Sequence, residues 1–428
     1  MLRQDFEQTP VIDRAKHGFD MSHWSASKGW QEVFLRACAA LSPADWADHE
    51  QAIRGLDAAG WLNISSVAER HGLVGLVSRS LDWADQELGV LIPVRERLAR
   101  RRQDQLLQLL ARRSSARQAA NALVARNITF VLYKGVALAD EVYGDLSLRA
   151  YGDCDILVRP DDVDSAFNAL QDIGFVAAAS TSVARQIANG STAIAMKRSQ
   201  ASVDLHWTLS ADRLFMKDMD IIWAHCGPPR DANALPGQRM SPELTLVNLA
   251  EHFCRHSFLE LKPLVDFRFA AVKYGAIVDP DTMHRLARSL ELHSMVDLTA
   301  RLSEKLLLPH PMTARLISGA PGFRTRIAGA VLTDRALVRT RDPRPTESRL
   351  RRLAFGGTVS AALRALRTML LPRLRDIESR FQRPFDLRMY PQYYMIQVRR
   401  VLTRSRKSFD AHAGLPSAFD LRSRVDGK

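Results

Sequence analysis

The chain has 428 residues, of which 46% are hydrophobic and 25% are charged, a composition typical of a globular protein with two or three domains and a sizeable core. Its four cysteines are widely spaced without a Cys-x-x-Cys motif, which fits a reducing compartment and argues against a zinc site. The first residues lack the apolar core of a signal peptide, and no uncharged apolar run approaches the roughly 18 residues of a membrane span. We therefore expect a cytoplasmic protein without a transmembrane segment.

The positive charge of the chain is concentrated in its C-terminal part. Residues 331–428 hold 22 Lys and Arg against 9 Asp and Glu, and this excess equals the formal net charge of the whole chain, +13. Residues 1–330 are therefore balanced, which argues against a catalytic domain built as a nucleic-acid cradle. Peripheral contact with a membrane or with nucleic acid is expected only through residues 331–428.

The part of the chain before residue 127 is predicted to be a flexible arm followed by helices. Residues 1–28 are polar and aperiodic, as a loose arm would be. Residues 29–126 carry apolar side chains at three- and four-residue steps, the period of an amphipathic helix. Gly72 is placed to end one helix, and residues 95–117 form a long basic helix whose charges make either a solvated face or a binding groove.

Residues 127–240 are predicted to form an α+β core. A first strand at 128–133 is followed by a helix at 135–143, and a second strand at 154–158 is followed by another helix. Further strands are predicted at 175–178, 192–196 and 202–207. A small mixed sheet of four or five strands flanked by two helices follows from this order, with helical regions before and after it.

The chain after residue 240 is predicted to be a helical domain and a basic tail. Residues 241–310 begin with Ser241-Pro242, a capping hydroxyl followed by a proline at the first helical position, and contain four helices. Residues 311–428 form a basic, partly helical tail with a linker at 341–345. A basic amphipathic helix at 358–376 would pack on the protein itself or lie on a membrane.

Three carboxylates in the strands of the core predict a cation site. Asp153 and Asp155 lie two apart at the head of the second strand, so alternation places them on one face. Asp204 lies within a later strand, where an unpaired charge is costly to bury. Carboxylates on neighbouring strands repel one another, and a hard divalent ion such as Mg²⁺ relieves that repulsion and brings a nucleotide phosphate with it.

These residues and their neighbours resemble the motifs of a known family. The pattern consists of Lys134-Gly135, Arg149, the run from Asp153 to Val158, and Asp204-Leu205-His206-Trp207. It is similar to the bacterial family of uncharacterised nucleotidyltransferases, within the superfamily that has the DNA polymerase beta-like catalytic core. The resemblance extends more loosely from about residue 61 to residue 311. One departure is that the Gly-Ser usual in the superfamily is Lys134-Gly135 here.

The resemblance implies an Mg²⁺-dependent enzyme that transfers a nucleoside monophosphate from an NTP such as ATP. The acceptor would be a hydroxyl or phosphate group of an unidentified small molecule, glycan, protein or RNA. Two Mg²⁺ ions, or Mn²⁺ in their place, would be held by the catalytic residues Asp153, Asp155 and Asp204, with Asp204 drawing the proton from the attacking hydroxyl. The nucleotide would contact Lys134, Gly135, Arg149 and His206.

Several of these side chains also have a purely structural interpretation. Lys134 could be a surface lysine, and Arg149 could pair with Asp153 instead of contacting the β- and γ-phosphates. His206 shares the face of Asp204 and would either orient a metal ligand or acceptor or be a satisfied core histidine.

The resemblance also implies roles in the helical domain. His252 and His256, four residues apart on one helix, would face the cleft and contact the base or the acceptor. Asp266 would make an ion pair that links helices.

Two other functions remain open from the residues alone. The first is a glycosyltransferase whose Asp-x-Asp motif holds the metal of a sugar nucleotide, although the expected βα units before that motif are missing from the pattern. The second is a non-catalytic, nucleotidyltransferase-like binding or scaffold protein that docks through its basic tail.

Overall fold

The computed structural model describes a large part of the chain: residues 29–47, 53–83, 92–177, 183–188, 191–199, 201–209, 218–231, 233–256, 258, 260–333, 338, 386–393 and 395. The chain divides into two compact units, residues 1–362 and 363–428, and the elements below belong to the first. The arm at 1–28, the linker at 341–345 and the amphipathic helix at 358–376 lie outside the described residues.

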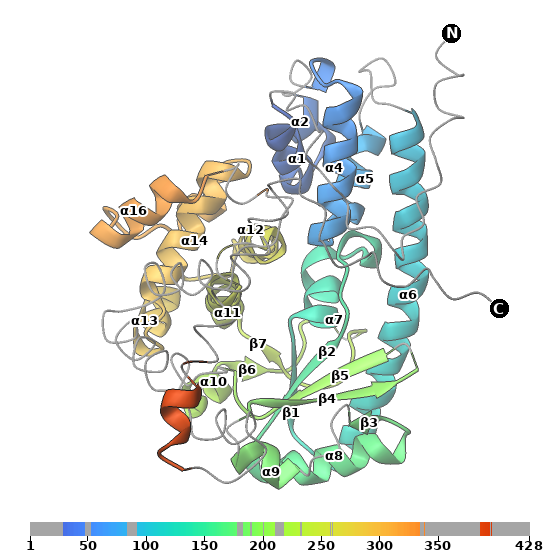
Figure 1. The fold of residues 1–428 in the computed structure, drawn as a ribbon, viewed down its shortest axis with the longest axis vertical. Coiled ribbons are helices and arrows are strands. Elements are labelled where there is room, and N and C mark those ends of the chain that lie inside the picture. The colour runs from blue at the N-terminus through green and yellow to red at the C-terminus, as the bar shows by residue number, and fades with distance from the viewer. Residues whose placement is uncertain are drawn as a thin grey trace, which may run out of the picture. The chain divides into compact units, whose positions relative to one another are not determined.

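The N-terminal region is helical, as predicted. Its elements are α1 (Trp30–Ala39), α2 (Pro43–Ala47), α4 (Ala58–His71), α5 (Val74–Trp83) and α6 (Ile92–Ala125). Helix α4 ends at Gly72, which adopts φ +65°, a left-handed conformation that favours glycine. The long helix α6 runs from beside α4 and α5 to the sheet (Figure 1).

A mixed five-stranded sheet forms the centre of the unit, which confirms the predicted α+β class. Its strands are β1 (Phe130–Tyr133), β2 (Cys154–Val158), β3 (Val176–Ala177), β4 (Ala193–Arg198) and β5 (Ala201–His206). The spatial order is β1-β2-β5-β4-β3, and β2 and β5 are parallel while the other neighbouring pairs are antiparallel. A two-stranded sheet of β6 (Cys226–Gly227) and β7 (Arg239–Met240) lies near β1.

Short helical elements connect the strands. After β1 come α7 (Gly135–Leu138), a π-helix η3 (Ala139–Tyr143) and a 3-10 turn η4 (Leu146–Leu148). After β2 come η5 (Pro160–Asp162), α8 (Val163–Asp172) and, beyond β3, α9 (Val183–Ala188), while α10 (Met219–Ala224) precedes β6. The predicted helix at 135–143 is therefore present, although its second half is wound as a π-helix.

The region after the sheet is helical, as predicted. Its helices are α11 (Pro242–Arg255), α12 (Leu261–Tyr274), α13 (Pro280–Ser289), α14 (His293–Leu306), α15 (Pro311–Ala314) and α16 (Phe323–Val331). Ser241 caps α11 by accepting a hydrogen bond from the amide of Leu244. Among the described helices, none has both the length and the apolar composition needed to cross a membrane.

The two faces of the sheet belong to two different hydrophobic clusters. One face, with Leu132, Ile156 and Leu205, packs against apolar side chains of α6 and α8. The other face contributes Val131, Tyr133 and Leu157 to a cluster shared with the N-terminal helices and with α11, α12 and α14. The polar residues of the candidate site lie on this second face, between the sheet and the helical domain.

Candidate functional site

The pairing of β2 with β5 brings two of the predicted carboxylates together. Asp155 and Asp204 are register partners on these parallel strands, so their side chains leave the sheet on the same face. His206 lies two residues after Asp204 and therefore shares that face. Ligand atoms of Asp155, Asp204 and His206 lie within 4.8 Å of one another.

The ammonium group of Lys134 occupies the edge of this cluster. Its Nζ lies 3.0 Å from Oδ1 of Asp155, and Nε2 of His206 lies 3.2 Å from the same oxygen. The ring of Tyr133 meets the His206 ring edge-on, with 5.5 Å between ring centroids. One carboxylate oxygen of Asp155 thus faces two cationic or hydrogen-bonding groups of the protein.

Asp153 lies immediately before β2 and is not part of the group of three. Burial and the nearby charge of Asp155 raise the pKa of Asp153. Its backbone carbonyl oxygen is close to Gly135, where an added Cβ would come within 2.7 Å of it. Gly135 is therefore required for the close approach of the first turn of α7 to the residues before β2.

The carboxylates of Asp155 and Asp204 have opposite electrostatic surroundings. Burial alone would raise the pKa of Asp155, but the charge of Lys134 and the hydrogen bond with His206 outweigh it and hold that pKa well below its usual range. Burial, followed by the charge of Asp153, raises the pKa of Asp204. Asp155 is therefore a stable anion, whereas Asp204 is the carboxylate that binds a proton more readily.

The residues present fit a divalent cation. Two carboxylates supply the hard oxygen ligands that Mg²⁺ and Mn²⁺ prefer, and an imidazole adds a nitrogen ligand that suits Mn²⁺ better than Mg²⁺. Asp155 already pairs with one positive charge, the ammonium group of Lys134. In addition, Nδ1 of His206 is buried without a hydrogen-bond partner among the described residues.

Arg149 makes a buried ion pair with Asp266. Its Nε and Nη2 each lie 2.8 Å from a carboxylate oxygen of Asp266 on α12, and its Nη1 donates to the carbonyl oxygen of Gly135 at 2.8 Å. Tyr143 donates a further hydrogen bond to Asp266, at 2.6 Å. Of the two roles left open for Arg149, the pairing with Asp153 is therefore wrong, because the guanidinium is buried and directed towards α12. The contact of Arg149 with the β- and γ-phosphates stays a prediction.

Comparison with models of protein families identifies the family of this chain. The model described as uncharacterised nucleotidyltransferase matches residues 57–307, more than half of the chain, and this range contains Lys134, Asp155, Asp204 and Asp266. The chain belongs to this family. No curated protein matches the chain significantly. The matched range agrees closely with the extent predicted from the motifs.

The helical domain of this nucleotidyltransferase family member adds basic side chains near the carboxylates. The pKa of His252 lies well below its usual value because of burial and of the charges of Lys134 and Arg255. Burial and the charge of Arg149 lower the pKa of Lys262, which also interacts with Asp153. Sequence reasoning placed His252 at the cleft but missed Arg255 and Lys262, because a basic residue on a helix has no spacing signal that distinguishes a site from a solvated face.

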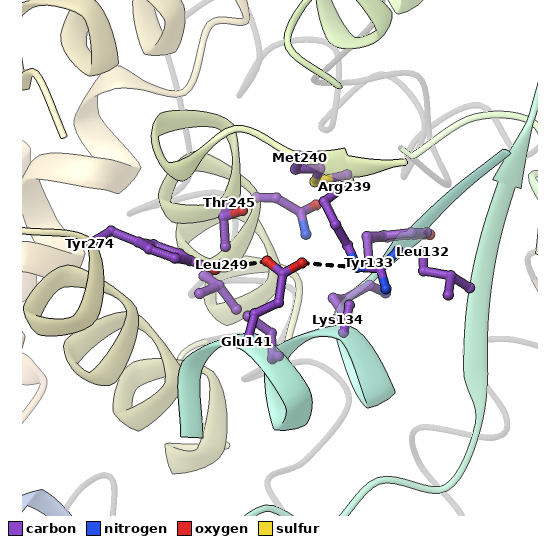
Figure 2. Close-up of a pocket in the computed structure, with 12 residues that line it drawn as sticks. Leu132, Tyr133, Lys134, Glu141, Arg239, Met240, Thr245, Leu249 and Tyr274 are labelled. Atoms are coloured by element: carbon purple, nitrogen blue, oxygen red, sulfur yellow. Dashed lines mark hydrogen bonds and ion pairs between the residues drawn. The ribbon is translucent and has the colours of Figure 1, made fainter. Parts of the chain in front are cut away.

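Lys134, which pairs with Asp155, also lines a pocket (Figure 2). It lies between β1, α7, β7, α11 and α12, and its empty volume, open solvent included, is about 310 Å³. Glu141 is held inside it by Arg239, whose Nε lies 3.0 Å from Oε1, and by the hydroxyl of Tyr274, which donates to Oε2 at 3.2 Å. Burial raises the pKa of Glu141 against the effect of Arg239.

Proposed function

We propose that the protein transfers a nucleoside monophosphate from an NTP to a hydroxyl or phosphate acceptor and releases pyrophosphate. The observation that carries this proposal is the convergence of Asp155, Asp204 and His206 on one face of the sheet, with ligand atoms within 4.8 Å of one another, in a member of a nucleotidyltransferase family. The lysine beside them supplies the positive charge that a polyphosphate requires.

The reaction is an in-line displacement at the α-phosphorus. The acceptor oxygen forms a bond to the α-phosphorus, the bond between the α-phosphorus and the bridging oxygen breaks, and pyrophosphate leaves with its electron pair. The proton of an acceptor hydroxyl goes to Asp204, because Lys134 and His206 already contact the carboxylate of Asp155.

The remaining residues of the cluster bind and orient the substrates. Asp155 and Asp204, with Asp153 close by, would hold two divalent ions, which when bound neutralise the triphosphate and favour ionisation of the attacking group. His206 orients Asp155 through its Nε2. Lys134 donates to phosphate oxygens, and Gly135 allows the backbone of α7 to lie close to the residues before β2.

The proposal is tested by transfer of label from α-³²P-labelled NTPs. We expect purified protein with Mg²⁺ or Mn²⁺ to label an acceptor from a cell extract, or itself slowly, and EDTA to stop the transfer. Asp155→Asn and Asp204→Asn should lower the rate by more than about 100-fold, since even an outer partner of a metal ligand contributes 10- to 100-fold. Asp164→Asn, which removes an exposed carboxylate of α8, is the matched control and should be unaffected.

Two results would contradict the proposal. One is label transfer by Asp155→Asn at the rate of the unaltered protein. The other is binding of all four NTPs to that variant as tightly as to the unaltered protein, because the nucleotide would then be held elsewhere.

A further inference from the structure

The ammonium group of Lys134 lies where it would compete with a divalent ion for the carboxylate of Asp155. Its Nζ lies 3.0 Å from Oδ1 of Asp155, and the exposed fractions of the two side chains are only 10% and 9%. The ammonium also lies 4.8 Å from the centroid of the Tyr133 ring, whose face attracts a cation. The positive charge is therefore buried at Asp155 and does not extend freely into solvent.

The backbone helps to direct this side chain towards the carboxylates. Lys134 is the residue between β1 and α7, and it has φ +53° and ψ −138°, a positive-φ conformation that non-glycine residues rarely adopt. Its carbonyl oxygen accepts a hydrogen bond from the amide of Leu138, which continues α7 back to this residue. A strained residue at a strand end is maintained by its surroundings, and here the ion pair with Asp155 is one such restraint.

A divalent ion and this ammonium would compete. An ion bound by Asp155 and Asp204 would lie close to Nζ, and two cations at such a distance repel strongly in a partly buried site. An NTP changes this balance, because its phosphate oxygens are an alternative acceptor for the ammonium. Lys134 also lines the neighbouring pocket, whose empty volume, open solvent included, is about 310 Å³ (Figure 2).

We propose that Lys134 is a counter-ion of Asp155 that weakens the binding of a free divalent ion at this carboxylate. When a metal–NTP complex binds, the ammonium group moves away from Asp155 and the metal ion binds there. This inference rests on the proposed function and adds an order of binding to it: metal and nucleotide enter together. In the absence of nucleotide the ammonium offsets the charge of the carboxylates. In its presence the same ammonium contacts the polyphosphate.

The test compares binding of Mn²⁺ alone with binding of Mn²⁺ and an NTP analogue. Lys134→Met keeps most of the length of the side chain and removes its charge. We expect this variant to bind Mn²⁺ alone about 10-fold more tightly than the unaltered protein, since a like charge beside the ion has been removed. It should bind the Mn²⁺ complexes of α,β-methylene NTPs about 10-fold more weakly, since a charged hydrogen bond to phosphate is lost. Calorimetry and the electron paramagnetic resonance of Mn²⁺ measure both.

A matched control separates this effect from a general change in charge. Lys273→Met removes one exposed lysine from α12 and should leave both affinities unchanged. Circular dichroism of Lys134→Met should show that the variant is folded. Equal or weaker binding of Mn²⁺ alone by folded Lys134→Met would overturn the inference.

Crystals of the unaltered protein give a second test that needs no variant. With Mn²⁺ alone, at a concentration below its dissociation constant for the unaltered protein, the contact between Nζ and Asp155 should remain and no anomalous Mn²⁺ peak should appear at Asp155 and Asp204. With Mn²⁺ and the analogue, the peak should appear and Nζ should contact phosphate. A peak with Mn²⁺ alone and Nζ still at Asp155 would overturn the inference. Absence of any binding of Mn²⁺–NTP to the unaltered protein would instead contradict the proposed function.

Discussion

Asp155 and Asp204 are neighbours in the sheet, yet they contribute differently to the stability of the metal-free protein. Asp155 has two groups that stabilise its charge, Lys134 and His206, whereas Asp204 is half-buried beside the like charge of Asp153. A carboxylate whose pKa is raised by folding destabilises the folded state when it is ionised. The site thus retains a charge that favours binding of a cation at some cost in stability.

The first prediction concerns the stability of Asp204→Asn without metal. Because the pKa of Asp204 is raised in the folded state, its charge opposes folding at neutral and alkaline pH. We expect the variant to be more stable than the unaltered protein by about 1 kcal/mol, the size of a typical single-substitution effect. The gain should shrink as the pH falls through the raised pKa, where the unaltered carboxyl is also neutral. Urea unfolding in EDTA as a function of pH measures this.

A lower stability of Asp204→Asn at every pH would contradict that prediction. It would mean that the carboxylate makes a stabilising contact that outweighs its burial and the repulsion from Asp153.

The second prediction concerns Gly135. A Cβ at this position would lie 2.7 Å from the backbone carbonyl oxygen of Asp153, so either the start of α7 or the head of β2 must move. We expect Gly135→Ala to destabilise the protein by about 1–3 kcal/mol, as overpacking does, and to reduce nucleotide binding. Gly152→Ala is the control, because no described atom lies within 4 Å of its added Cβ. Denaturant unfolding and nucleotide titration of the two variants should differ, and equal behaviour would show that the contact is readily relieved.

At the scale of elements, a buried ion pair joins the segment before β2 of the central sheet to the helical domain. Arg149 lies on the segment between η4 and β2, and Asp266 lies on α12, 117 residues later. Tyr143 of η3 donates to the same carboxylate, and Arg149 also donates to Gly135 at the start of α7. The ion pair therefore positions the two segments that carry Gly135 and Asp153 relative to α12.

The third prediction tests this link. Asp266→Asn leaves the buried guanidinium of Arg149 without its counter-charge, and we expect a loss of about 3–5 kcal/mol in the free energy of unfolding. The double variant Arg149→Met with Asp266→Leu should recover most of that loss, because an apolar pair of similar volume often replaces a buried ion pair at little cost. Urea unfolding of the single and double variants measures both effects.

We expect the double variant to bind nucleotide more weakly than the unaltered protein does, even though its stability is largely recovered. The hydrogen bond from Arg149 to Gly135 would still be missing, so the affinity for NTP should stay below that of the unaltered protein. Full affinity in the double variant would show that the ion pair has no positioning role.

At the scale of the whole unit, helices that precede the sheet in the chain and helices that follow it share one core with it. The cluster beneath the candidate site combines Trp61 and Phe34 from the N-terminal helices, Tyr133 and Leu157 from the sheet, and Phe253 from α11. The opposite face of the sheet is covered by α6. The domain boundaries predicted at residues 126 and 240 stay predictions, but this shared packing favours cooperative unfolding across them.

The fourth prediction follows from that packing. A fragment of residues 127–240 would expose the sheet face that α6 covers and the face that packs against α11. We expect the fragment to be unfolded or aggregated, whereas residues 29–333 should unfold in a single transition. Circular dichroism and calorimetry distinguish the two outcomes, and a folded, monomeric fragment would show that the core is an independent domain.

Much of the fold and part of the candidate site follow from local sequence. The cap at Ser241, the helix end at Gly72 and the apolar strand at 154–158 each depend on a few consecutive residues, and each is present as predicted. Each family motif is also a short run of consecutive residues, so the family could be predicted from the sequence alone. Most of residues 331–428, which are predicted to form a basic tail, lie outside the residues that the structure describes.

Only the tertiary structure decided which side chains meet. The register of β2 with β5 places Asp155 opposite Asp204 and leaves Asp153 outside the group of three, and a strand pattern does not contain the identity or register of its neighbour. The partner of Arg149 could not be predicted for the same reason, since Asp266 reaches it only through the packing of α12. Local patterns determine elements because their causes are a few residues apart, whereas the partner of a buried charge depends on contacts between segments more than 100 residues apart.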